Sequence, residues 1–408
     1  MSACPGFLVI IGAFVWLALI GGVAAAGRPE WMPAAPPLPL TGRVVPVGTT
    51  DELREAVSHA RDGDTIMIAD GVYQLDGFLQ LTSRTNVTIR GASGDASKVE
   101  LRGIGWDDTS RDDILRIQAC TGVTIAYLTF AECHAYAIKL EQTPHEGRQL
   151  KDVHIYACKF RNIGTRAIKG TGGGGGFVEG GSIRYCDFEN TKIPPTTWLM
   201  EGDYITAIDC MRLKNWVIAD NYFRDIRGAN GGGRGAVFVW VESEGVVSER
   251  NVFVNCDRSI AYGNPSGSTE GPSRPHMTNG VIRNNFIVAG ADTGIELCWV
   301  NGVKVYHNTV LTPGADGSGI HYHWNDISGV EIANNLVRGR IWGDQGGVTQ
   351  RGNQTSGVED SWFRDVGCGD LHLTDDARTA TVSRLADCPE DFDRAARPQQ
   401  TAPGADQP

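Results

Sequence analysis

One hexapeptide pattern recurs along most of the chain and constrains its fold more than any other feature. The pattern is hydrophobic-x-x-(Asn/Cys)-x-hydrophobic, as in Ile218-Ala-Asp-Asn-Tyr-Phe223 and Ile332-Ala-Asn-Asn-Leu-Val337. Successive matches follow one another at intervals of 23 to 35 residues. Such a period, made of strand-length runs and glycine turns, is typical of a solenoid. Because the periods contain no helix-length apolar pattern, we predict that each repeat is a coil of β-strands.

The fourth position of the pattern indicates how the coils stack. It is occupied in turn by Leu128, Cys158, Cys186, Asn221, Asn251, Asn285, Asn308 and Asn335. Coils of a β solenoid lie about 4.8 Å apart. Asparagine amides at one turn can therefore donate to one neighbour and accept from the next. We predict a buried, mutually hydrogen-bonded asparagine column, preceded by a stack of buried thiols.

Composition agrees with a turn-rich β protein. The chain has 52 glycines in 408 residues, well above the average usage of about 7%, which disfavours a helical bundle. Hydrophobic residues make up 41% and supply a core. The formal net charge of -11 argues against nucleic-acid binding, which requires a basic surface. A polyanionic partner would need a local basic patch or a bridging cation.

The first 26 residues have the pattern of an export signal. An apolar run at 7–20 is shorter than the roughly 20 residues of a membrane span, and small residues follow up to Ala26. We expect a signal peptide at 1–26 and a secreted or periplasmic protein with no other membrane segment. An uncleaved anchor is the alternative, since no Lys or Arg precedes the run. Export permits disulfides, and Cys120–Cys133 and Cys368–Cys388 are candidate pairs.

The rest of the chain divides into four parts. We expect a Pro-rich linker at 27–48, a parallel β-helix with an N-terminal cap at 49–345, a C-terminal cover over the last coil at 346–394 and a disordered tail at 395–408. In the cap, Thr49 and Glu52 form a capping box that begins an amphipathic helix. This helix is expected to plug the first coil.

The coils at 86–337 resemble right-handed parallel β-helix proteins of the pectin lyase-like superfamily. The cap segment DELREAVSHARDGDTIMIADGVY at 51–73 is similar to the opening of secreted polysaccharide lyases of the chondroitinase B and alginate lyase kind. The resemblance implies an all-β fold, a right-handed parallel β-helix, and a polysaccharide as partner. It does not extend to the reaction. The sequence lacks the DPHD motif of mannuronan epimerases, the polygalacturonase motif series and the RHG segment of the alginate lyase group.

A second strand in each coil is predicted to present two outward columns of side chains. The strands are aligned on inward residues: Ile138, Ile168, Ile208, Val237, Ile260, Ile295 and Ile320. Because strand side chains alternate, the next residues point outward: Lys139, Lys169, Asp209, Phe238, Ala261, Glu296 and His321. Two residues further lies the second column: Glu141, Thr171, Met211, Trp240, Gly263, Cys298 and His323. Both columns should face one groove, flanked by Arg258 and Tyr262.

These columns supply the candidate site. The candidate catalytic residues are Lys169, Asp209, Arg258, His321 and His323. The candidate substrate-binding residues are Lys139, Phe238, Trp240, Tyr262 and Glu296. Lysine or histidine can remove the C5 proton of a uronate, and arginine can neutralise its carboxylate. Aromatic side chains suit a sugar-binding groove. The alternative is a solvated face with cross-coil pairs of Lys169 with Asp209 and Glu296 with His321.

We expect a secreted carbohydrate-active protein, most simply a polysaccharide lyase-like enzyme that acts on an acidic, uronate-containing polysaccharide by β-elimination. A non-catalytic glycan-binding or cell-surface adhesion solenoid is the first alternative, and a hydrolase or epimerase on the same scaffold is the second. No cofactor is firmly indicated. The acidic stretch at 106–113 could bind Ca²⁺, or it could be a solvated loop, because it lacks EF-hand spacing.

Overall fold

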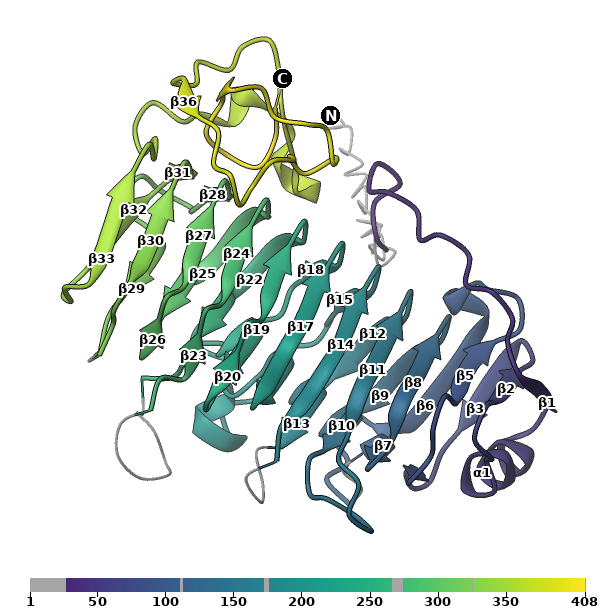
Figure 1. The fold of residues 1–408 in the computed structure, drawn as a ribbon. Helices are drawn as coiled ribbons and strands as arrows, with labels where there is room; N and C mark the ends of the chain where they lie inside the picture. The colour runs from purple at the N-terminus through teal and green to yellow at the C-terminus, as the bar shows by residue number, and fades with distance from the viewer. Residues whose placement is uncertain (1–26, 111–112, 172–175, 266–273, 325, 408) are drawn as a thin grey trace, which may run out of the picture.

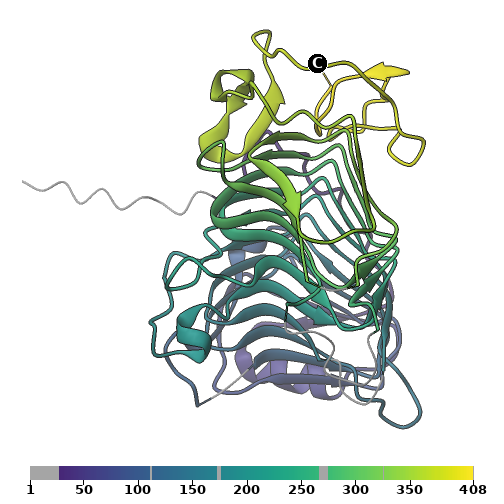
Figure 2. The ribbon, with the colours of Figure 1, turned by 90° about the vertical axis from the view of Figure 1, so that its left-hand side faces the viewer.

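The computed structural model describes residues 27–110, 113–171, 176–265, 274–324 and 326–407. In these ranges the chain winds into a stack of coils whose strands pair in parallel with the coils before and after them (Figure 1 and Figure 2). Each coil has three faces. This arrangement confirms the predicted all-β parallel solenoid.

The first face is one long parallel sheet. Its strands are β1 (Arg43–Val47), β2 (Asp64–Ile68), β5 (Thr88–Gly91), β8 (Thr121–Ala126), β11 (Lys151–Tyr156), β14 (Val178–Arg184), β17 (Leu213–Ala219), β21 (Val247–Glu249), β24 (Val281–Arg283), β27 (Lys304–Tyr306), β30 (Val330–Ala333) and β33 (Val348–Arg351). The short strands β20 (Ser243–Glu244), β23 (Met277–Thr278) and β26 (Val300–Asn301) extend it.

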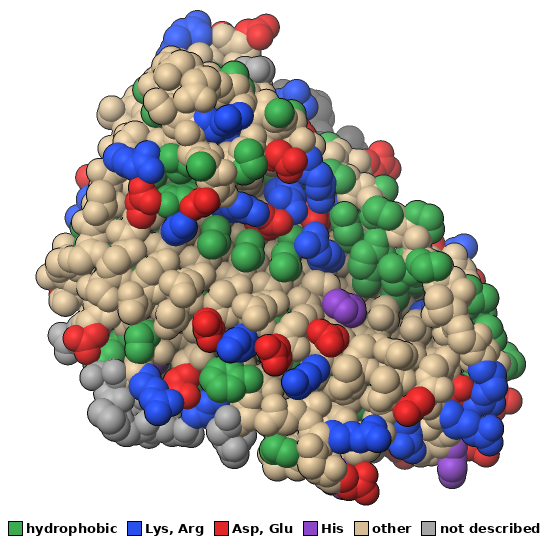
Figure 3. Space-filling model, viewed as in Figure 1, with side chains coloured by type: hydrophobic (Ala, Val, Ile, Leu, Met, Phe, Trp, Pro, Cys, Tyr) green, Lys and Arg blue, Asp and Glu red, His purple; other side chains and the backbone are tan. Residues whose placement is uncertain are grey.

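On the side of the molecule drawn in Figure 3, cationic and anionic side chains are interspersed. That side offers no concentrated positive field of the kind a polyanion requires.

A second sheet wraps the other two faces. The second face consists of β3 (Gly71–Gln74), β6 (Val99–Gly105), β9 (Thr129–Cys133), β12 (Lys159–Ile163), β15 (Asp187–Glu189), β18 (Tyr222–Arg224), β28 (Thr309–Leu311) and β31 (Leu336–Arg338). The third face consists of β4 (Leu79–Thr82), β7 (Asp113–Gln118), β10 (Tyr136–Glu141), β13 (Arg166–Thr171), β16 (Thr206–Met211), β19 (Gly235–Trp240), β29 (Ser318–Tyr322) and β32 (Arg340–Gly343). Two long strands, β22 (Val252–Tyr262) and β25 (Phe286–Leu297), run through both faces.

A two-residue turn joins the first face to the second in eight successive coils. Its first residue has a positive φ in every case: Tyr127, Ala157, Tyr185, Asp220, Arg250, Asn284, His307 and Asn334. This left-handed conformation costs about 1–2 kcal/mol for a residue with a Cβ atom. Contacts made by the second residue of the turn must offset this conformational cost. That second residue is the fourth position of the sequence pattern, and it is buried.

The predicted asparagine column is confirmed. The Oδ1 atom of Asn285 accepts from the backbone N of Asn251 at 3.0 Å and from its Nδ2 at 3.1 Å. The same double contact joins each successive pair and extends to Asn353, beyond the predicted column. In the strands that follow this turn, phenylalanine rings stack with centroids 4.5–4.8 Å apart from Phe160 to Phe253. The amide column and the ring stack together fix the register of the coils.

Replacing Asn251 with leucine should cost about 1–3 kcal/mol of unfolding free energy. The change leaves the backbone N and Nδ2 of Asn221 without their acceptor and removes the donor to the carbonyl of Ile218. Urea denaturation measures the loss, with the exposed Asn301 changed to leucine as the matched control. Equal stability of the two variants would contradict a structural role for the column.

The N-terminal cap matches its prediction, with one correction. Helix α1 (Thr50–Ser58) begins with the expected capping box of Thr49 and Glu52, and it buries Leu53 and Val57 in the first coil. The linker predicted at 27–48 is not wholly a linker, because its end forms β1 and pairs with β2. The strand was missed because its short apolar sequence follows a Pro-rich segment and itself contains Pro46.

Residues 27–38 lie along the outside of the solenoid. The backbone N of Leu38 donates to the Tyr127 hydroxyl at 2.8 Å, and the Tyr156 hydroxyl donates to the Pro36 carbonyl at 2.5 Å. The backbone N of Arg28 donates to Asp187 Oδ2 at 3.1 Å. This part of the linker is therefore fixed to successive coils by its backbone.

The C-terminal cover lies beside the last coils, where it contacts the outside of the second face (Figure 1). It was expected over the end of the stack. Its strands form two antiparallel pairs: β34 (Phe363–Asp365) with β35 (Asp370–Leu373), and β36 (Val382–Ser383) with β37 (Gln400–Thr401). Short 3-10 helices complete the described chain: η1 (Ala96–Lys98), η3 (Leu199–Gly202), η4 (Asp360–Trp362) and η5 (Val366–Cys368). In the cover, the ring of Phe392 stacks on that of Phe286 at 4.1 Å.

The prediction of a disordered tail at 395–408 is wrong for the described residues 395–407. The Arg397 side chain is buried and donates to the carbonyls of Gly404 and Ala405, both at 2.9 Å. The backbone N of Ala405 in turn donates to Thr309 Oγ1 at 2.9 Å. A Pro- and Gln-rich composition suggested disorder, but one buried guanidinium satisfies the carbonyls of the turn.

The nine described cysteines are free thiols, so neither candidate disulfide is formed. Cys388 Sγ contacts Asn284 Oδ1 at 3.3 Å, whereas Cys368 lies by Asp365. Cys158 and Cys186 are buried as predicted, and burial raises the pKa of Cys186.

Residues 111–112 of the acidic stretch lie outside the described residues. Within the rest, Asp113 pairs with Arg116, and Asp108 accepts from the backbone N of Ser110 at 2.9 Å. Calcium binding there stays a prediction. In the described ranges, helices lack the length and apolar character that a membrane span requires.

Candidate functional site

The third face carries the predicted outward column in the predicted register. Lys139 pairs with Lys169, Lys169 with Asp209, and Asp209 with Phe238. The column then continues through Ala261 and Glu296 to His321. Side chains far apart in the sequence are therefore neighbours on one face, and they form two clusters separated by Phe238 and Ala261.

The first cluster surrounds Asp209. Its carboxylate is fully buried and lies 2.9 Å from Lys169 Nζ and 3.0 Å from Arg166 Nε. The indole Nε1 of Trp240 donates to its other oxygen at 3.0 Å. Burial alone would raise the pKa of Asp209, but the charges of Lys169 and Arg166 lower it below its usual range. The pairing of Lys169 with Asp209 is thus present, in a buried form that includes Arg166.

This geometry disfavours Lys169 as a proton acceptor. Its Nζ lies 2.9 Å from Asp209 Oδ2 in a buried ion pair, whereas a base must be free to take a proton from the substrate. The Lys169 side chain is only 8% exposed, so a substrate could not reach it without displacing its neighbours. We therefore interpret this cluster as structural.

The aromatic side chains beside Asp209 are packed, contrary to their predicted role in sugar binding. Phe238 and Trp240 are 1% and 6% exposed, with ring centroids 5.2 Å apart and nearly parallel planes. Tyr262 faces the interior, where its hydroxyl hydrogen-bonds Ser248 at 2.9 Å. Since Ile260 points inward, strand alternation also turns Tyr262 inward. None of the three offers an open ring face to a sugar.

Lys139 lies at the start of the column. Its Nζ is 3.5 Å from Glu141 Oε2, and both side chains are about one-fifth exposed. The pair joins the two outward columns within one strand. It leaves Lys139 more accessible than Lys169.

The second cluster surrounds Glu296. Its Oε1 lies 2.9 Å from His323 Nε2, and its Oε2 lies 3.0 Å from Arg258 Nη1. Arg258 also pairs with Asp292. Burial raises the pKa of Glu296, but Arg258 and His323 outweigh burial and lower it. The Glu296 carboxylate therefore pairs with His323. The sequence had suggested His321 as its partner.

The His321 side chain makes no hydrogen bond with any described residue. Its ring stacks between those of His323, at 3.7 Å, and Trp342, at 3.8 Å. Burial, with the charge of His323, lowers the pKa of His321 to about 4. The imidazole is therefore neutral at pH 7, and one of its two ring nitrogens carries a lone pair that can accept a proton.

Sequence reasoning missed several residues at this cluster. Trp342 is 37% exposed and lies opposite His321 in the next strand, β32. If the first outward column had been extended by one coil, Trp342 would have been its last member. The Arg340 guanidinium lies 4.8 Å from the Trp342 ring. Arg234 Nη2 donates to Asn264 Oδ1 at 2.5 Å, from loops that carry no strand pattern. Cys298 was aligned in the second column but given no role.

Comparison with known proteins places the chain among right-handed β-helix proteins. The family model described as the right handed beta helix region matches residues 113–337. No curated protein matches the chain.

Several solved structures are similar. The alginate lyase from Paenibacillus sp. str. FPU-7 is 16% identical over 75% of this chain and 99% of that chain, with a TM-score of 0.47. The periplasmic alginate epimerase AlgG is 11% identical over 76% of this chain and 82% of that chain, with a TM-score of 0.39. The catalytic unit of the GH87 α-1,3-glucanase from Streptomyces thermodiastaticus strain HF3-3 is 12% identical over 79% of this chain and 70% of that chain, with a TM-score of 0.42. Because the family model covers more than half of its residues, the chain belongs to the right-handed β-helix family.

Proposed function

We propose that the protein binds an acidic, uronate-containing polysaccharide along the third face and cleaves it by β-elimination, with His321 as the proton acceptor. The observation that carries this proposal is the His321 imidazole. It has no hydrogen bond with a described residue and it stacks on a partly exposed tryptophan. An unpaired imidazole beside an aromatic platform is suited both to holding a sugar and to taking a proton from it.

The neighbours of His321 supply the rest of the chemistry. Arg340 is exposed and stacks over Trp342, so its guanidinium can neutralise the carboxylate of a uronate held there. Neutralisation makes the C5 proton more acidic. His321 accepts that proton, a double bond forms between C4 and C5, and the bond from C4 to the glycosidic oxygen breaks. The leaving oxygen takes a proton from water.

Arg258 has a different role in this proposal. Its guanidinium already pairs with Asp292 and Glu296, so it is not available to a substrate. It orients Glu296, which in turn fixes the His323 ring against which His321 stacks. Arg258, Glu296 and His323 are thus positioning residues.

A panel of acidic and neutral polysaccharides tests the proposal. Elimination produces an unsaturated uronide that absorbs in the ultraviolet, and we expect this product from an acidic polymer only. Binding without any product would favour the glycan-binding alternative. New reducing ends without ultraviolet absorbance would favour a hydrolase, and either outcome would overturn the elimination.

We also propose that the protein is exported and cleaved after Ala26. The position of Gly27 next to a carboxylate supports this proposal. A Cβ atom built on Gly27 would lie 3.6 Å from Asp187 Oδ2. The Asp187 side chain is buried, and its Oδ1 has no hydrogen bond in the described ranges. An α-ammonium group at Gly27 would bring a positive charge to this carboxylate.

A protein that begins at Gly27 should be more stable than one with two extra residues before it. A hydrogen bond to a charged group contributes about 1.5–3 kcal/mol, and the extended form lacks the ammonium at that place. Urea denaturation compares the two forms, and N-terminal sequencing of secreted material locates the cleavage. Equal stability would contradict the Asp187 contact, and recovery of residues 1–26 in a membrane fraction would contradict cleavage.

A further inference from the structure

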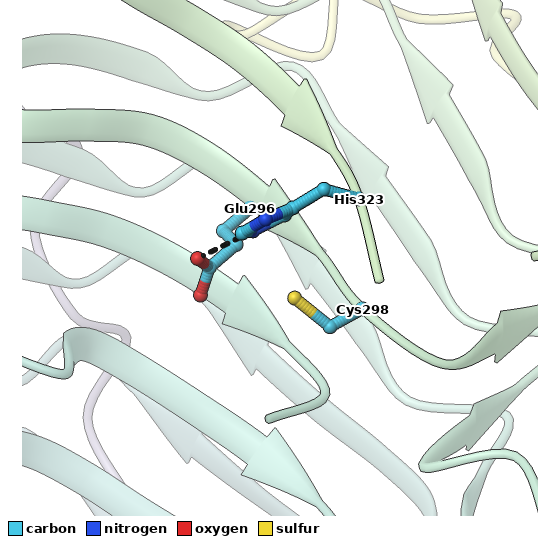
Figure 4. A group of neighbouring side chains, drawn as sticks. All are labelled: Glu296, Cys298 and His323. Carbon is cyan, nitrogen blue, oxygen red and sulfur yellow. Dashed lines mark hydrogen bonds and ion pairs between the residues drawn. The ribbon is translucent and has the colours of Figure 1, made fainter. Parts of the chain in front are cut away.

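Three side chains of different chemistry converge beside His321. Glu296 belongs to β25, Cys298 follows that strand, and His323 follows β29 in the next coil. One ligand atom from each lies within 4.8 Å of the other two. Figure 4 shows the carboxylate, the thiol and the imidazole directed toward a common space.

The coil register explains why they meet. Glu296 pairs with His321, so two residues further along, Cys298 lies opposite His323. The backbone N of His323 donates to the Leu297 carbonyl at 3.0 Å and holds the two chains side by side. Each of the three residues points outward, because all share the strand parity of Glu296.

We propose that Glu296, Cys298 and His323 form a binding site for a divalent transition metal ion, with zinc as the best match. Thiolate, imidazole and carboxylate are the ligands of zinc sites, and three protein ligands leave a fourth tetrahedral position open. Calcium is a poor match, because it takes six to eight oxygen ligands. The site is therefore distinct in place and in chemistry from the acidic stretch at 106–113.

Distance and charge both suit such an ion. With bonds of about 2.0–2.3 Å, tetrahedral ligand atoms lie roughly 3.3–3.8 Å apart, so small side-chain rotations close the site. The ion would replace the proton between Glu296 and His323 and the proton of the Cys298 thiol. A carboxylate and a thiolate then balance the two positive charges, while Arg258 is balanced by Asp292.

The described cluster of His372, Asp393 and Asp406 is a useful contrast. Both imidazole nitrogens of His372 are occupied, by Asp370 Oδ1 at 2.5 Å and Asp393 Oδ2 at 3.0 Å. Burial lowers the pKa of His372, but these carboxylates outweigh burial and raise it to about 9. Because both ring nitrogens of His372 already hydrogen-bond carboxylates, and this group contains no thiol, it provides the control.

Cobalt binding tests the site without any substrate, so its outcome is independent of the proposed elimination. The full-length protein, treated with a chelator, is titrated with Co²⁺, and Zn²⁺ is then added in competition. We expect one Co²⁺ per chain, with visible bands of a tetrahedral ion and a near-ultraviolet charge-transfer band from the thiolate. Zn²⁺ should displace the cobalt, because zinc binds such N, O and S sites more tightly.

Ligand variants identify the residues. Cys298→Ser should abolish the charge-transfer band, and His323→Asn should weaken binding by more than the 10–100-fold typical of lost outer-shell contacts. His372→Asn should change neither the stoichiometry nor the affinity. Urea denaturation of each metal-free variant separates loss of the site from loss of the fold.

Three outcomes would overturn the proposal. They are wild-type protein that binds no Co²⁺, a charge-transfer band that survives in Cys298→Ser, and binding that is lost in His372→Asn but kept in His323→Asn. Wild-type protein that binds Co²⁺ but cleaves no polysaccharide would contradict the proposed function and leave the metal site supported.

Discussion

Changing His321 to alanine is expected to lower the turnover of an acidic polysaccharide by about 10²–10⁴-fold, the usual contribution of a positioned general base. Trp342 and Arg340 would remain to hold the sugar. The loss should therefore appear in kcat, with KM changed much less. Initial rates of ultraviolet absorbance on the best polymer of the panel give both constants.

His154→Ala is the matched control, because this exposed imidazole lies on the first face and contacts Ser182 at 3.0 Å. Its rates should equal those of the wild type. Full activity in His321→Ala would reject His321 as the base. An equal loss in both variants would trace the effect to stability and not to chemistry.

Lys169→Ala is expected to destabilise the fold by about 3–5 kcal/mol, the cost of removing one partner of a buried ion pair. The variant leaves the fully buried Asp209 with Arg166 as its remaining cationic partner, which places the loss toward the lower end of that range. The unfolding free energy from urea denaturation measures it. Lys169 points outward as predicted from strand alternation, but its side chain is only 8% exposed and does not lie on a solvated face.

The matched control is Lys151→Ala, since Lys151 pairs with Glu179 at 3.5 Å and both side chains are nearly half exposed. Exposed pairs contribute at most about 1 kcal/mol. Equal losses in the two variants would contradict a buried charge cluster. Acid offers a second measurement: the lowered pKa of Asp209 adds stability above the usual carboxyl pKa, and this stability is lost as pH falls through the folded value.

The sequence was sufficient to predict which residues are neighbours. Strand alternation and one inward residue per coil placed Lys169 beside Asp209 and Glu296 beside His321. The asparagine column was equally predictable, because a short-range pattern repeated in register implies stacked turns.

Exposure could not be predicted in the same way. Whether Lys169 or Trp240 is open to solvent depends on side chains such as Tyr204, which comes from an irregular loop and hydrogen-bonds Asp209 at 3.4 Å. Trp342 was missed because the pattern fades after Val337, although the coil continues. Periodicity thus predicts register, whereas accessibility depends on loops that have no period.

The corners of each coil differ in how much change they tolerate. The corner that holds the asparagine column is two residues long in eight coils, and a single insertion there would turn every following side chain of that coil to the opposite side. The corners that border the third face vary from unbroken strands, as in β22, to the long connection at 190–205. Loops of different length can thus be accommodated beside the third face without a change in the core of the coils. The third face is also the side where we propose that the polysaccharide binds, so exchanging these loops one coil at a time would change the proposed specificity and leave the scaffold intact.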